Sequence, residues 1–167
     1  MIRVVMMLSG NGSRQRSRIT ILSVSTRSRT ANTLSYSGKK GYVDHVLQSG
    51  RLLLGENFSP LLDFMPLDEY NRLQSDVSVA LFGNWRQEAI GNIIVALYLG
   101  AKVFLSHVNP VYEWAQSHGL TVYELEKLSQ KELDTPLDRE TKLRNRQILL
   151  SLYTKERMYR LIKDLSV

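Results

Sequence analysis

Short apolar runs rich in β-branched residues alternate along the chain with segments whose apolar residues recur at helical spacing. The runs predict strands at 3–8, 33–36, 60–64, 77–83, 102–105 and 121–125, whereas residues 19–24 fit either a strand or a helix. The helical spacing predicts helices at 42–54, 67–73, 86–99, 110–117 and 137–165, the last broken near Tyr153 and Thr154. Gly55, Gly100 and Gly119 follow three of these helices and are expected to end them.

This alternation predicts an α/β fold that is Rossmann-like, with a mainly parallel sheet and helices on both faces. Right-handed crossovers bring the strand-to-helix loops to one edge of such a sheet, and ligands bind at that edge. Five loops are expected there, at residues 10–13, 35–40, 64–66, 84–92 and 107–110. Their convergence predicts a ligand site.

The segment 84–92 gathers two amides, an arginine and a carboxylate where a strand is expected to end and a helix to begin. In that position the free N–H groups of the first helical turn favour an anion, and Arg86 can clamp a phosphate through two hydrogen bonds. The alternative interpretation is a polar helix start that caps itself, with Asn84 as the N-cap and Gln87 at the third helical position. The other loops at the same edge favour the phosphate site.

A glycine turn at residues 10–13 offers a second place for a diphosphate, although it lacks the lysine of a P-loop. His45, His107 and His118 have no spacing that indicates a metal site, and they are interpreted as structural or surface residues. The chain contains no cysteine, which excludes disulfides, thiol catalysis and cysteine–zinc sites. Neither a metal nor a cofactor is predicted.

The net charge of +6 arises in the first quarter of the chain. Of the 22 basic side chains, eight lie in residues 1–43, which contain no Asp or Glu, and this leaves 14 basic against 16 acidic side chains in the remainder. Such a basic segment suits a phosphate ligand, an anionic membrane surface or nucleic acid. The sequence has no groove-reading motif, zinc finger or aromatic–basic interleaving, so nucleic acid is not expected as a partner.

Four stretches of the sequence match a known pattern: 34–38 (LSYSG), 63–70 (DFMPLDEY), 84–92 (NWRQEAIGN) and 96–103 (ALYLGAKV). Through them, residues 34–128 resemble the C-terminal half of the bacterial TDP-4-acetamido-4,6-dideoxy-D-galactose transferases, the 4-alpha-L-fucosyltransferase-type family of enterobacterial common antigen synthesis. Residues 14–32 match this family poorly. The expected organisation is therefore a divergent basic segment at 1–32 and a nucleotide-sugar (donor) binding domain at 33–167.

The resemblance implies the donor half of a two-domain GT-B glycosyltransferase, incomplete as an enzyme without an N-terminal acceptor domain. It implies transfer of a deoxyamino sugar from a TDP donor to a lipid-linked saccharide, with retention of configuration and without a metal. Arg86 and Glu88 are the expected catalytic residues, because Arg86 can stabilise the departing diphosphate and Glu88 can contact a sugar or ribose hydroxyl. The other expected donor-binding residues are Gly10, Asn11, Gly12, Ser13, Ser35, Tyr36, Phe64, Met65, Pro66, Asn84, Gln87, Gly91 and Asn92.

The expected location is the cytoplasm, with peripheral contact to the inner face of the bacterial plasma membrane because the acceptor is lipid-linked. The sequence itself has no apolar run long enough to span a bilayer and no signal-peptide pattern. An alternative function stays open, that of a non-catalytic Rossmann-like module that binds a nucleotide or phosphate and carries a basic arm. Comparing the binding of TDP, UDP, GDP and short RNA separates the two functions.

Overall fold

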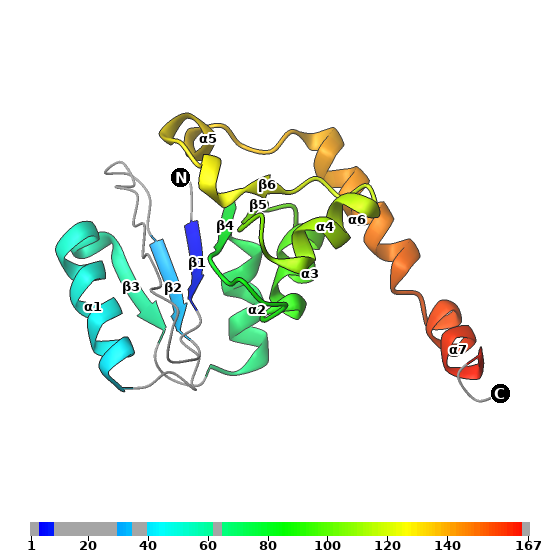
Figure 1. Ribbon diagram of the computed structural model, residues 1–167, viewed down its shortest axis with the longest axis horizontal. Helices are drawn as coiled ribbons and strands as arrows, with labels where there is room; N and C mark the ends of the chain where they lie inside the picture. The colour runs from blue at the N-terminus through cyan, green and yellow to red at the C-terminus, as the bar shows by residue number, and fades with distance from the viewer. Residues whose placement is uncertain (1–3, 9–29, 35–39, 62–64, 165–167) are drawn as a thin grey trace.

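A parallel β-sheet organises the computed structural model, which describes residues 4–8, 30–34, 40–61 and 65–164 (Figure 1). Its strands are β1 (Val4–Leu8), β2 (Thr30–Leu34), β3 (Phe58–Leu61), β4 (Val79–Phe82), β5 (Lys102–Leu105) and β6 (Tyr123–Glu124). Their order across the sheet is β3-β2-β1-β4-β5-β6, and every neighbouring pair is parallel. The predicted α/β class with a parallel sheet is confirmed.

The helices connect the strands and then continue beyond the sheet. They are α1 (Lys40–Leu54), α2 (Leu67–Ser75), α3 (Ile90–Leu99), α4 (Pro110–Ser117), α5 (Gln130–Asp134), α6 (Arg139–Leu152) and α7 (Lys155–Asp164), with 3-10 turns η1 (Gly55–Asn57) and η2 (Leu125–Lys127). Figure 1 shows α7 projecting away from the sheet at the end of α6.

The core lies on both faces of β4 and β5, because successive residues of a strand point to opposite faces. On one face Ala80 and Phe82 belong to a buried cluster that includes Leu97 of α3, Ala115 of α4 and Leu149 of α6. On the other face Val79, Leu81 and Phe104 pack with Leu133 of α5. All four residues of β4 and all four residues of β5 are therefore buried. This explains why β4 is entirely apolar and why β5 is apolar except for Lys102.

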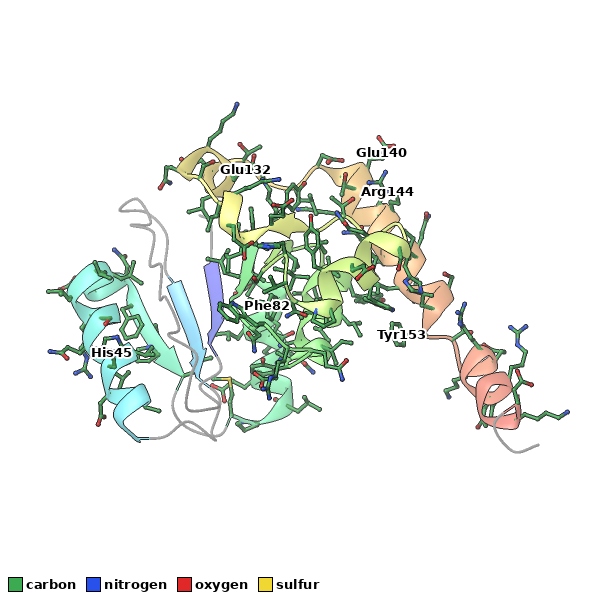
Figure 2. The ribbon with its side chains drawn as sticks, in the orientation of Figure 1. His45, Phe82, Glu132, Glu140, Arg144 and Tyr153 are labelled. Atoms are coloured by element: carbon green, nitrogen blue, oxygen red, sulfur yellow. The ribbon has the colours of Figure 1, made fainter. Side chains whose placement is uncertain are left out.

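Several predicted boundaries agree with the structure. Residues 102–105 form β5 and residues 110–117 form α4, as predicted. Gly55, Gly100 and Gly119 adopt positive φ angles just after α1, α3 and α4. The last predicted helix is broken at Tyr153, the residue between α6 and Thr154, and Tyr153 lies at this break in Figure 2.

Other boundaries were wrong. The strand predicted at 121–125 is only the two-residue β6, and α5 and the two 3-10 turns were not predicted. The strands predicted at 33–36 and 60–64 begin earlier, as β2 and β3, and residues 35–36 and 62–64 lie outside the described residues. The segment 19–24 also lies outside them.

The most important correction concerns the helix predicted to begin at Arg86. Helix α3 begins only at Ile90, after Ala89, which adopts a left-handed conformation with φ of 59°. The carbonyl oxygens of Asn84 and Arg86 accept hydrogen bonds from the Asn109 side chain. These tertiary hydrogen bonds hold residues 84–89 as a loop, so Asn84 is not the N-cap of α3.

Gly50 allows α1 to pack closely on β3. A Cβ atom at this position would lie 2.2 Å from the ring of the buried Phe58. We expect Gly50→Ala to destabilise the fold, because overpacking costs about 1–3 kcal/mol and exceeds the roughly 1 kcal/mol that alanine gains over glycine in a helix. Urea unfolding measures the effect.

Gly41, in the same helix, provides the matched control for Gly50→Ala. A Cβ atom at Gly41 would meet none of the described residues within 4 Å, so Gly41→Ala is expected to be neutral or stabilising. Equal stability of the two variants would contradict the packing of Gly50 against Phe58.

Candidate functional site

The loop that follows β4 is built from residues 83–89 and is called here the β4 loop. Phe82, which ends β4, is anchored in the centre of the molecule (Figure 2) and is 1% exposed. Asn84 is buried, whereas Arg86 and Gln87 are exposed and the Trp85 side chain is 54% exposed. The loop therefore starts in the core and presents three consecutive polar or aromatic side chains at the surface.

Asn109 joins the β4 loop to the loop after β5, residues 106–109. Its side chain is 1% exposed, and its Nδ2 donates to the carbonyl oxygens of Asn84 (2.8 Å) and Arg86 (3.0 Å). Its Oδ1 accepts from the backbone N–H of Val111 at 2.9 Å and so caps α4. One buried amide thus fixes two loops at the carboxyl edge of the sheet.

A second contact closes the β4 loop on itself. Asn84 Nδ2 donates to Glu88 Oε2 at 3.2 Å, and the Glu88 side chain is half-buried. Glu88, predicted to contact a sugar or ribose hydroxyl, is therefore positioned by Asn84. Its other carboxylate oxygen forms no hydrogen bond with the described residues, and the predicted role stays a prediction.

Arg86 is the exposed cation of this loop. Within the described part of the chain, its guanidinium forms no ion pair and no side-chain hydrogen bond. Its backbone carbonyl is held by Asn109, so the base of the side chain is fixed while the charged end is in solvent. An arginine in this state can form two parallel hydrogen bonds with a phosphate.

The first turn of α3 follows directly after the β4 loop. Ile90, Gly91 and Asn92 occupy it, and their N–H groups precede the first intrahelical hydrogen bond, which Ile93 donates to Ala89. Gly91 is exposed, and a Cβ atom there would meet none of the described residues within 4 Å. The described part of the chain therefore leaves space beside this helix end.

Asn92 faces α2. Its Oδ1 accepts hydrogen bonds from the Tyr70 hydroxyl (3.0 Å) and from Gln74 Nε2 (3.2 Å). These contacts tie α2 to α3 and do not involve the β4 loop. Contact with a ribose hydroxyl stays a prediction for this residue.

A hydrogen-bonded group around the carboxylate of Glu126 occupies the neighbouring part of the edge, where η2 meets the loop after β5. Glu126 accepts hydrogen bonds from the Ser106 hydroxyl and from the His107 N–H, and the His107 ring nitrogen Nδ1 lies 3.3 Å from Glu126 Oε1. Partial burial raises the pKa of Glu126, but these hydrogen bonds more than offset it, so the pKa lies below its usual range. The stabilisation that these contacts give to the fold is fully present above the ordinary glutamate pKa. It is lost as the pH falls through the lowered pKa of Glu126.

The remaining predicted site residues are placed only in part. Met65 is half-buried and Pro66 is exposed, and the Pro66 carbonyl accepts the Tyr70 N–H at 2.9 Å at the start of α2. Outside the described residues lie Gly10, Asn11, Gly12, Ser13, Ser35, Tyr36 and Phe64.

Sequence reasoning missed three residues that shape this edge: Trp85, Asn109 and Glu126. The Asn109-Pro110 pair is a helix-start signal that could have identified the cap, because an N-cap asparagine and a proline at the first helical position are both favoured. Glu126 gave no such signal, since its partners lie on another loop.

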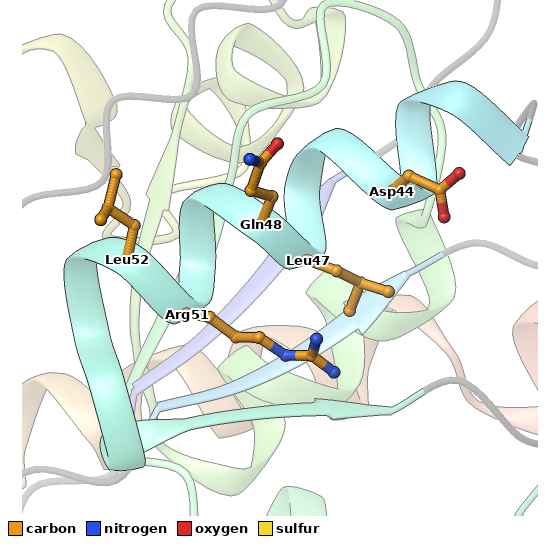
Figure 3. Close-up of a pocket in the computed structure, with 5 residues that line it drawn as sticks. All are labelled: Asp44, Leu47, Gln48, Arg51 and Leu52. Carbon is orange, nitrogen blue, oxygen red and sulfur yellow. The ribbon is translucent and has the colours of Figure 1, made fainter.

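A separate hollow of about 510 Å³ lies along α1 (Figure 3). Its described lining comes from one helix, and none of its residues belongs to the loops after β4 and β5. They are Asp44, Leu47, Gln48, Arg51 and Leu52. Among the described residues, the hollow shares no lining residue with the candidate site.

Compared with protein-family models and with curated protein sequences, the chain has no match. The similarity to the transferase family accordingly depends on the four stretches of sequence given above. Among the described residues, no helix combines the length and apolar character needed to cross a bilayer. In the same part of the chain, no group of three or more His, Asp or Glu side chains is arranged to hold a metal ion.

Proposed function

We propose that this chain is a Rossmann-like domain that binds a nucleoside diphosphate sugar at the β4 loop. The observation that carries the proposal is the exposed Arg86 guanidinium, without an ion-pair partner among the described residues, on a loop that Asn109 fixes at the carboxyl edge of the sheet. Arg86 and the open first turn of α3 together offer a cation and free N–H groups to a phosphate.

The strand order supports this location. In doubly wound sheets of order 3-2-1-4-5-6, ligands bind where the order reverses, in the crevice between strands 1 and 4. Here β1 and β4 are direct neighbours, with Val4 opposite Val79 and Met7 opposite Phe82. The β4 loop follows Phe82 and therefore borders that crevice.

The resemblance extends the proposal to a TDP-linked deoxyamino sugar, transferred by a GT-B glycosyltransferase to a lipid-linked saccharide. As the bond between the sugar and the diphosphate breaks, negative charge builds on the departing TDP. A preorganised guanidinium and helix N–H groups stabilise that charge, and this is the role we assign to Arg86 and α3. Glu88, held by Asn84, is proposed to contact a hydroxyl of the donor.

The acceptor belongs to a second domain in this proposal. We propose that a separate acceptor domain binds the lipid-linked saccharide, and that the assembled protein works at the inner face of the bacterial plasma membrane. The donor domain alone is then expected to bind TDP and the TDP-sugar without transferring the sugar.

Calorimetry of the chain with TDP, in the presence of a chelator, tests the binding site. Arg86→Ala is expected to lower TDP affinity by roughly 10- to 150-fold, because a charge-assisted hydrogen bond contributes about 1.5–3 kcal/mol. Arg86→Lys should recover only part of the loss, since an ammonium group cannot bind a phosphate in the same bidentate geometry.

Arg157→Ala is the matched control, because Arg157 is an exposed arginine on the projecting helix α7. It should leave TDP affinity unchanged, and the melting temperatures of both alanine variants should equal that of the parent chain. Unchanged TDP binding in Arg86→Ala would remove the phosphate-clamp assignment, and absence of TDP binding in the parent chain would end the proposal.

A further inference from the structure

Trp85 is the exposed aromatic side chain of the β4 loop. Just over half of its surface, 54%, is accessible to solvent. An exposed indole leaves a large apolar area in water, and covering it contributes a favourable free energy. Within the described chain, no ring or cation lies against Trp85 and no hydrogen bond holds its indole nitrogen.

The backbone at Trp85 is nevertheless fixed on both sides. Asn109 Nδ2 donates to the carbonyl oxygen of Asn84 (2.8 Å) and to that of Arg86 (3.0 Å), the residues directly before and after Trp85. Asn109 itself is fully buried, so the hydrogen bond to Asn84 is shielded from water and the one to Arg86 is partly shielded. A rigid loop thus holds the indole outward, which lowers the entropy that a ligand must overcome to contact it.

The neighbours of Trp85 indicate which ligand fits. Arg86 is adjacent in sequence and has no ion-pair partner among the described residues, so a ligand that covers Trp85 also meets a free cation. Val108, on the loop that Asn109 joins to this one, adds a second exposed apolar side chain. A planar ring linked to a phosphate matches this combination of an aromatic face and an adjacent cation.

We infer that Trp85 stacks on the nucleobase of the nucleoside diphosphate whose phosphate binds Arg86. This inference depends on the function proposed above and adds the residue that binds the base. Stacking on an indole tolerates every base, because each base has a π-face. Trp85 therefore contributes affinity for a nucleoside without choosing which one, and TDP, UDP and ADP should all contact it.

Tryptophan fluorescence can follow this contact directly. The chain contains two tryptophans, Trp85 and Trp114, and Trp114 lies half-buried on α4 with its ring 5.0 Å from that of His118. In a Trp114→Phe variant, Trp85 is the sole tryptophan. Titrating TDP into this variant should quench its fluorescence, whereas titrating pyrophosphate should be detected by calorimetry without quenching.

Affinity measurements provide the second readout. Trp85→Ala is expected to weaken TDP binding by roughly 5- to 150-fold, since stacking on one base contributes about 1–3 kcal/mol. Trp85→Phe should recover part of the affinity, and pyrophosphate affinity should be unchanged in both variants. Because the side chain is exposed, the melting temperature should stay close to that of the parent chain.

The outcomes separate the two proposals. If TDP and pyrophosphate both bind while Trp85 fluorescence and the TDP affinity of Trp85→Ala are unchanged, the stacking inference is overturned and the phosphate site stands. If TDP quenches Trp85 fluorescence but UDP and ADP do not, Trp85 is part of a base-selective pocket. The inference that its stacking accepts every base is then overturned. If neither TDP nor pyrophosphate binds, both the proposed function and this inference fail.

Discussion

Asn109→Ala is expected to lower the free energy of unfolding by about 2–4 kcal/mol. The change removes the cap of α4, which contributes about 0.5–2 kcal/mol, and leaves the carbonyls of Asn84 and Arg86 without their donor at a cost of about 1–3 kcal/mol each. Relaxation of the loops and water entry reduce the sum. Because the same hydrogen bonds fix the β4 loop, TDP affinity should also fall.

Asn109→Ser separates the two roles of this side chain. A serine hydroxyl can still cap α4, but it is too short to reach both carbonyls of the β4 loop. We expect Asn109→Ser to recover the capping part of the stability and little of the TDP affinity. Urea unfolding and calorimetry on both variants measure this, and an alanine variant as stable as the parent chain would show that the amide does not hold the two loops together.

Glu132→Ala should be the second strongly destabilising substitution, by about 3 kcal/mol. Lys102 is only 3% exposed, and its ammonium group binds the Glu132 carboxylate and the carbonyl oxygens of Glu132 (2.9 Å) and Thr135 (3.2 Å). Removing one partner of a buried ion pair costs about 3–5 kcal/mol, since the remaining charge is left uncompensated. The Glu132 side chain is 38% exposed, which places the expected loss at the lower end of that range.

Replacing both partners provides the control for Glu132→Ala. In Lys102→Met with Glu132→Leu, no buried charge remains, and the methionine can pack against the rings of Phe104 and Tyr123, which lie beneath the ammonium group. The double variant should be more stable than Glu132→Ala alone in urea unfolding. If Glu132→Ala were as stable as the parent chain, the ammonium group would have to be satisfied without the carboxylate.

The elements that local sequence determines were predicted well. The bounds of β5 and α4 follow from an apolar run and from the Asn109-Pro110 start, and glycines ended three helices where expected. The start of α3 was wrong because its determinant lies elsewhere in the chain: Asn109 holds the carbonyls that an earlier helical turn would use. Helix α5 was not predicted from the sequence. It has only five residues, and Lys102 of the sheet donates hydrogen bonds to carbonyl oxygens near its end.

The candidate site shows the same division. Its position at the end of β4 followed from the alternation of strands and helices, and Arg86 was identified from its residue type beside a strand end. The cap of α4 could have been predicted from Asn109-Pro110, but the hydrogen bonds by which Asn109 and Glu126 join separate loops have no local pattern. Trp85 was interpreted only as part of a matching stretch, because exposure of an aromatic residue is a property of the folded chain.

The central position of β1 has a consequence for how the chain folds. This strand comes first in the sequence, yet it pairs on one side with β2 and on the other with β4, so that Val4 lies opposite Val79. The two halves of the sheet can therefore join only after the long chain segment between β1 and β4 has closed into a loop. This closure costs conformational entropy before the hydrogen bonds between the strands compensate for it. Until β4 arrives, one edge of β1 is unpaired and able to pair with another chain. Folding speed and protein concentration thus decide together how much chain reaches the native sheet and how much aggregates.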